Sequence, residues 1–116
     1  MTIQTLETKT EIEVNFPSIK ELKLGEVVTW QHGTQMVYLG TTLKENSFAY
    51  SEFIGYSVNF LGSARILRVR QNTLSFNDEG RLESNCLWSE EIIPLVSFDT
   101  RYAAKIKLLK GSRLKK

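Results

Sequence analysis

The chain of 116 residues has the length of one globular domain, and its content of 41% hydrophobic and 24% charged residues argues against wholesale disorder. Its longest apolar runs are too short to span a bilayer, and its first sixteen residues lack the apolar core of a secretory signal. A lone Cys86 excludes an intrachain disulfide, and a lone His32 argues against a zinc-ligand cluster. We therefore expect a cytoplasmic protein without a cofactor, a bound metal or a membrane partner.

Positive charge is concentrated at the C-terminal end of the chain. Residues 1–100 carry eight basic and thirteen acidic side chains, a net charge of −5. The last sixteen residues carry no acid and seven basic side chains, namely Arg101, Lys105, Lys107, Lys110, Arg113, Lys115 and Lys116. Such asymmetry is typical of a surface that contacts a polyanion, and a tail that only improves solubility is the alternative.

Alternating apolar and polar residues predict strands in the first part of the chain. The first strand is expected over residues 11–16, followed by a short helical turn that ends at Gly25. Two further strands are expected over residues 26–31 and 35–43, joined by a turn. Trp30 alternates with Val28 in the first of these two strands, so we expect its side chain to be buried.

The same pattern continues through the middle of the chain. Residues 48–53 and 56–60 are expected to form separate strands, because Gly55 interrupts the run between them. Further short strands are expected over residues 65–70, 73–76, 81–88 and 92–98. Short elements at this spacing are the signature of a small barrel or sandwich.

Residues 100–110 fit two structures. Asp99 or Ser97 could cap a helix in which Tyr102, Ile106 and Leu109 share one stripe, with Gly111 beyond its end. The alternation of Ala104, Ile106 and Leu108 also fits a short strand. We favour the helix, because Ala, Lys, Leu and Arg have high helix propensity. The chain is thus expected to form one β-rich domain over residues 1–110, followed by a basic flexible tail over 111–116.

No combination of side chains predicts an active site. His32 is expected in a turn without a neighbouring group that could orient it for catalysis. Cys86 alternates with Leu82 and Trp88, which indicates a small buried hydrophobic residue rather than a reactive thiol. Adjacent carboxylates on a strand point to opposite faces, so Glu90 and Glu91 form a poor acid–base pair. We expect no catalytic residues and no enzyme activity.

Aromatic residues gather near a basic strand in the middle of the chain. Six of them lie within 23 residues, namely Tyr38, Phe48, Tyr50, Phe53, Tyr56 and Phe60. Exposed rings beside arginines would offer stacking surfaces to single-stranded nucleic acid, whereas buried rings would form the core that a small β domain needs. Arg68 and Arg70 share a strand face on which Ile66 is the only apolar residue, which indicates a second cationic patch.

Two segments resemble a known family of small domains. Residues 24–30, Leu-Gly-Glu-Val-Val-Thr-Trp, and residues 38–41, Tyr-Leu-Gly-Thr, resemble the opening of an SH3-like small barrel of the Tudor or KOW type. Residues 91–95 resemble the closing strand of such a barrel, so the resemblance covers about a third of the chain. It implies a binding fold without catalysis. The strand at 11–16, the long middle at 48–80 and the basic C-terminal segment exceed a simple barrel of this type.

The sequence therefore predicts a mostly β domain, a small SH3-like barrel or roll with a C-terminal basic helix or tail. We expect a binding module for nucleic acid, DNA or RNA, because phosphate contacts require clustered cations. The alternative is a protein-interaction module or inhibitor that acts on a partner protein or complex. A continuous positive strip from Arg68 and Arg70 to the tail would favour nucleic acid, and an isolated tail would favour a protein partner. The expected nucleic-acid-binding residues are Arg68, Arg70, Arg101, Lys105, Lys107, Lys110, Arg113, Lys115 and Lys116.

Overall fold

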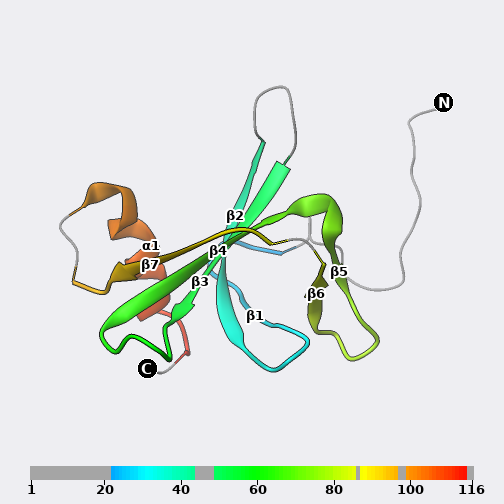
Figure 1. Cartoon of the computed structure of the whole chain (residues 1–116), viewed down its shortest axis with the longest axis horizontal. Coiled ribbons are helices and arrows are strands. Elements are labelled where there is room, and N and C mark those ends of the chain that lie inside the picture. Colours follow the sequence, from blue (N-terminus) through cyan, green and yellow to red (C-terminus); the bar gives the residue numbers. More distant parts are fainter. Residues whose placement is uncertain (1–21, 44–48, 86, 97–98, 115–116) are drawn as a thin grey trace.

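The computed structural model describes residues 22–43, 49–85, 87–96 and 99–114. Its main element is a five-stranded antiparallel sheet with the strand order β1-β2-β3-β4-β7 (Figure 1). The strands of this sheet are β1 (Val27–Thr29), β2 (Gln35–Leu43), β3 (Ala49–Tyr56), β4 (Ser63–Arg70) and β7 (Leu87–Pro94). The prediction of a mostly β protein is confirmed.

Two smaller elements accompany the sheet. A 3₁₀ turn, η2 (Gln71–Thr73), leads into a two-stranded hairpin of β5 (Leu74–Phe76) and β6 (Leu82–Ser84). The helix α1 (Thr100–Lys110) follows β7, and it lies at the opposite end of the molecule from the hairpin (Figure 1). Among the described strands, β1 and β7 are the outer ones and do not pair with each other, so no closed barrel is formed.

Both faces of the sheet carry apolar side chains. The hairpin packs on one face through Leu82, against a buried cluster that includes Trp30, Phe53 and Leu67. The helix packs on the other face through Ile106 and Leu109, against a second buried cluster. The sheet side chains of this second cluster are Val37, Ile54, Ala64, Ile66 and Ile93. The face of β4 that carries Arg68 and Arg70 is therefore the face that α1 covers.

The burial of Trp30 is confirmed. Its side chain is 7% exposed, and its ring meets the ring of Phe53 edge-on, with 5.2 Å between centroids and 75° between planes. The ring of Tyr38 also lies beside that of Phe53, with 5.6 Å between their centroids. Large rings thus fill the first cluster, as expected for a small β domain.

The predicted break at Gly55 is wrong. β3 runs through Gly55 to Tyr56, and residues 57–62 form a loop rather than a strand. A Cβ atom at Gly55 would lie 3.2 Å from both Met36 Cγ and the Gln35 carbonyl oxygen. The glycine therefore allows β2 and β3 to approach closely, and it does not interrupt the strand.

The boundaries of the later strands also differ from the prediction. The expected strand over residues 81–88 is divided, because β6 ends at Ser84, and β7 continues from Leu87 through the expected gap to Pro94. The expected strand over residues 11–16 and the expected burial of Cys86 lie outside the described residues.

The helix expected over residues 100–110 is confirmed, and the alternative of a strand is wrong. Asp99 is the N-cap, and its carboxylate accepts a hydrogen bond from the Arg101 backbone N–H at 2.9 Å. Gly111 follows the last turn as the C-cap. Beyond it, Leu114 packs against the second apolar cluster, while the flexibility of residues 111–116 stays a prediction.

Candidate nucleic-acid interface

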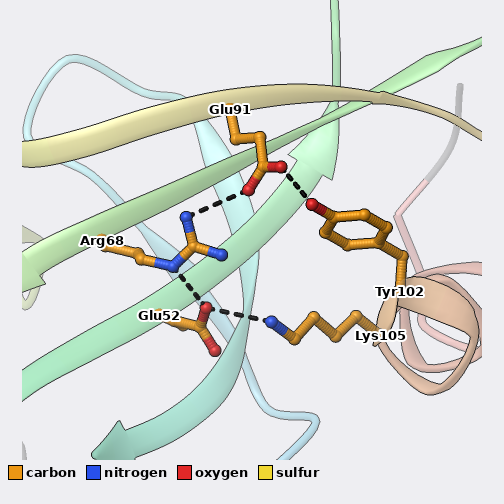
Figure 2. Close-up of polar contacts among 5 residues, drawn as sticks. All are labelled: Glu52, Arg68, Glu91, Tyr102 and Lys105. Atoms are coloured by element: carbon orange, nitrogen blue, oxygen red, sulfur yellow. Dashed lines mark hydrogen bonds and ion pairs between the residues drawn. The ribbon is translucent and has the colours of Figure 1, made fainter. Parts of the chain in front are cut away.

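Five polar side chains connect α1 to the sheet. Glu52 of β3, Arg68 of β4 and Glu91 of β7 meet Tyr102 and Lys105 of the helix (Figure 2). One oxygen of Glu52, Oε2, accepts from Arg68 Nε at 2.7 Å and from Lys105 Nζ at 3.0 Å. Arg68 also donates to Glu91 at 3.1 Å, and the Tyr102 hydroxyl donates to the other oxygen of Glu91. These contacts form one continuous polar network between helix and sheet.

The network shifts the pKa values of three of its groups. The hydrogen bond from Tyr102, aided by Arg68, lowers the pKa of the Glu91 carboxyl against the opposing effect of burial. The same hydrogen bond raises the pKa of Tyr102. For Arg68, burial is the largest single influence and lowers the pKa, but hydrogen bonds to Glu52 and Glu91 outweigh it and raise the pKa. All three groups are thus held in their usual charge states at neutral pH.

Two of the predicted nucleic-acid contacts lie inside this network. The side chain of Arg68 is 19% exposed and is shared between two carboxylates, and Lys105 is engaged by Glu52. Each cation therefore already has an anionic partner within the protein. The residues near Arg68 and Lys105 in the sequence do not indicate these ion pairs, because Glu52 lies 16 positions from Arg68 and 53 positions from Lys105.

Arg101 and Arg70 are placed differently. Arg101 lies at the start of α1, where its guanidinium binds the carboxylate of the capping residue Asp99 and lies 5.1 Å from the ring centroid of Tyr102. This pairing lowers the pKa of Asp99 to about 2, chiefly through the side-chain hydrogen bond. Arg70 is half-buried at the end of β4, which leads toward β5 and away from α1 (Figure 1). The predicted positive strip from Arg68 to the tail is thus interrupted at Arg68.

The remaining predicted nucleic-acid-binding residues that the structure describes lie at the C-terminal end of α1 or just beyond it. Lys107, Lys110 and Arg113 are exposed, and their side chains make no hydrogen bond or ion pair with any described residue. Lys107 and Lys110 are three residues apart, so they are neighbours on the helix surface, where positive charge also complements the helix dipole. Lys115 and Lys116 follow outside the described residues. We call Lys107, Lys110 and Arg113 the cationic end.

A loop with exposed apolar side chains lies beside the cationic end. In the β3–β4 loop, Val58 is 88% exposed, Phe60 58% and Leu61 94%. Val58 and Leu61 border a hollow of about 680 Å³ that is also lined by Arg113. Apolar side chains exposed together in this way are typical of an interaction surface. The sequence pattern did not indicate this surface, because the alternation of residues 56–60 predicts a strand.

The structure also places three other side chains that the sequence singled out as candidates. His32 is exposed in the β1–β2 turn, where its Nδ1 lies 3.2 Å from the Thr34 hydroxyl. Glu90 and Glu91 point to opposite faces of β7, as predicted, with Glu90 bound to Arg65. Within the described ranges, no three His, Cys, Asp or Glu side chains are grouped closely enough to hold a metal ion.

In the part of the chain that the structure describes, no helix has the length and apolar character needed to cross a bilayer. Comparison of the chain with known protein families, with curated proteins and with solved structures found no match.

Proposed function

We propose that the protein is a non-enzymatic binding module of the cytoplasm that binds nucleic acid, with the cationic end as its phosphate-binding surface. Lys115 and Lys116 follow this surface directly in the sequence and would extend it. The antiparallel succession of β1 to β4 is compatible with the SH3-like resemblance of residues 24–41, and we retain that relationship as part of the proposal.

One observation carries this proposal. The carboxylates Asp99 and Glu52 pair with Arg101 and Lys105, yet no described carboxylate contacts the three cations of the cationic end. Lysines and arginines without internal partners can neutralise phosphates without first breaking an ion pair. Because the rest of the chain is acidic, a polyanion would be drawn to this end of the molecule rather than to the body.

A salt titration tests the proposal. Binding of labelled single-stranded and double-stranded oligonucleotides is measured by fluorescence anisotropy at increasing salt. Each phosphate contact contributes about 0.9 to the log–log slope for duplexes and about 0.7 for single strands. Lys107→Gln and Lys110→Gln should each weaken binding of unrelated sequences alike and flatten the slope by about one such step.

Arg81→Gln is the matched control. It removes one positive charge near the hairpin, at the opposite end of the molecule from α1, and should leave the slope unchanged (Figure 1). No binding of DNA or RNA at low salt, in either single- or double-stranded form, would contradict the proposed function.

A second candidate function is a protein-interaction module or inhibitor. Two observations favour it. The positive strip is interrupted at Arg68, and an isolated tail is the arrangement expected for a protein partner. Two aliphatic side chains, Val58 and Leu61, are also exposed, which nucleic acid would not require. A pulldown from the native cell with and without nuclease distinguishes the two functions. Protein partners that survive nuclease treatment and are lost with Val58→Ser and Leu61→Ser would support the second.

A further inference from the structure

Two adjoining hollows are lined by the β3–β4 loop. The larger, of about 680 Å³, is bordered by the β1–β2 turn, by the loop and by Arg113. The smaller, of about 370 Å³, is bordered by Phe60 and Arg65. The two hollows share Thr34, Tyr56, Ser57 and Val58, so they adjoin each other, and the larger one reaches the cationic end at Arg113. We call the two adjoining hollows together the depression.

The structure separates the aromatic residues of this region into core and surface. Tyr38 and Phe53 are buried, and Tyr50 is half-buried. Among the side chains that the structure describes, Phe60 is the one exposed aromatic residue, and it lies at the smaller hollow. Tyr56 is half-buried and borders both hollows.

Hydrogen bonds hold the backbone that carries the Phe60 ring. The Phe60 N–H donates to the hydroxyl of the buried Ser57 at 3.1 Å, and the Phe60 carbonyl accepts from the Ser63 N–H at 3.1 Å. The Ser57 N–H donates to the Ser63 carbonyl at 3.0 Å. The loop is thus ordered before any ligand binds, which lowers the entropy lost when a ligand contacts the ring.

From these observations we infer that the depression binds single-stranded nucleic acid, with unpaired bases against Phe60 and Tyr56 and the backbone phosphates against Arg113 and Lys110. The inference rests on the proposed function and adds the class of nucleic acid. An aromatic ring can stack on a base only when the base is unstacked, and a cation beside the ring is then placed for the adjoining phosphate. In a duplex the base faces are covered, so the ring would have no partner.

The charges of the depression fit this orientation of the strand. Arg65, at the smaller hollow, is paired with Glu90, whereas Arg113, at the larger hollow, has no described carboxylate in contact. Phosphates are therefore favoured on the Arg113 side, and Lys110 lies three residues before Arg113 in the chain. The bases would then extend toward Phe60, where the glutamate would repel a phosphate.

An abasic oligonucleotide tests the role of the bases. Three labelled probes of equal length are compared by anisotropy at one low salt concentration: a thymidine single strand, an abasic strand with the same phosphates, and a mixed-sequence duplex. The wild-type protein should bind the thymidine strand about tenfold or more tightly than the abasic strand, the effect expected from one stacked base. It should also prefer the thymidine strand to the duplex.

Variants of one residue separate stacking from apolar contact. Phe60→Leu keeps an apolar side chain without an aromatic face, and it should weaken binding of the thymidine strand to the level of the abasic strand. Phe60→Trp should retain the tight binding, and Leu24→Ser, a change of an exposed apolar side chain that lines neither hollow, should have little effect. Binding of the abasic strand should be the same in all variants, because its phosphates contact only the cationic end.

Two results would overturn the inference, and they have different consequences for the proposed function. Equal binding of thymidine and abasic strands, unchanged by Phe60→Leu, would remove the stacking site but leave phosphate binding by the cationic end intact. Failure of all three probes to bind would remove both, and would favour a protein partner for the exposed loop.

Discussion

Lys105 of α1 donates from Nζ to Glu52 Oε2 of β3 at 3.0 Å, and so connects the middle of the helix to a central strand. Glu52 is almost fully buried, and the same oxygen also accepts from Arg68. Glu52 is the centre of this contact, because its removal would leave Arg68 and Lys105 without the carboxylate that they share.

Glu52→Ala should therefore destabilise the protein more than Lys105→Met. Removal of the carboxylate leaves a largely buried Arg68 with one anionic partner, and we expect a cost of about 2–3 kcal/mol in the free energy of unfolding. Lys105→Met keeps the Glu52–Arg68 pair and should cost about 1 kcal/mol or less. Urea denaturation of both variants measures the difference. A larger cost for Lys105→Met would contradict the central role of Glu52.

Tyr102→Phe should change how stability depends on pH. In the folded protein the Tyr102 hydroxyl lowers the pKa of Glu91, so this carboxylate stabilises the fold above its unfolded pKa near 4.5, and the contribution is lost as the pH falls through the lower folded pKa. We expect Tyr102→Phe to destabilise the protein above pH 5 and to destabilise it less near pH 3. Urea denaturation between pH 3 and pH 7 measures this, and a cost that is the same at every pH would exclude the linkage.

Titration at alkaline pH measures the hydrogen bond between Tyr102 and Glu91 independently. Glu91 raises the pKa of Tyr102 above its usual value of 10, so the neutral phenol stabilises the fold below pH 10, and the contribution is lost as the pH rises through the raised pKa. Absorbance titration of the phenols in wild type and in Tyr102→Phe identifies the late-titrating group. If Tyr102 ionised as an ordinary tyrosine, the hydrogen bond to Glu91 would be absent in solution.

Trp30→Ala should be strongly destabilising, because the substitution leaves a cavity beside Phe53 in the first apolar cluster. We expect a cost of about 3–5 kcal/mol, the range for truncation of large buried aromatic side chains. In a Trp88→Phe background, tryptophan fluorescence reports on Trp30 alone. Its quenching by iodide should be far weaker than that of free tryptophan, and equal quenching would show that Trp30 is exposed.

Leu114→Ala examines whether the C-terminal residues contact the domain in solution. The side chain is half-buried against the second apolar cluster, so its truncation should cost about 1 kcal/mol. Arg113→Ala, at the exposed neighbouring position, is the control and should leave the melting temperature unchanged. A tail that does not contact the domain would give the same melting temperature for both variants.

Local patterns predicted much of the fold. The alternation around Trp30, the span of β2 and the capped, amphipathic α1 all depend on neighbouring residues, and the structure confirms each of them. The strand break predicted at Gly55 is wrong, because this glycine makes room for the close approach of Met36 on another strand. A single sequence does not contain that information in any local window.

The candidate site was harder to predict for a related reason. The charge of Arg68 is visible in the sequence, but its availability depends on Glu52 and Glu91, which lie on other strands. The exposure of Phe60 likewise depends on the end of β3 one residue after Gly55. The charged and aromatic residues could thus be identified from the sequence. Which side chains they contact could be known only once the pairing of the strands was known.

The position of Glu91 on β7 has a consequence for solubility. β7 is an outer strand among the described elements, and an outer strand with free backbone groups can pair with a second molecule and start aggregation. Here Glu91 places a carboxylate on the helix-covered face, Glu90 places another on the opposite face, and Pro94 removes a backbone donor at the end of the strand. A strand added at this edge would have to desolvate both charges, so β7 is protected against edge-to-edge association by the same glutamate that anchors Tyr102.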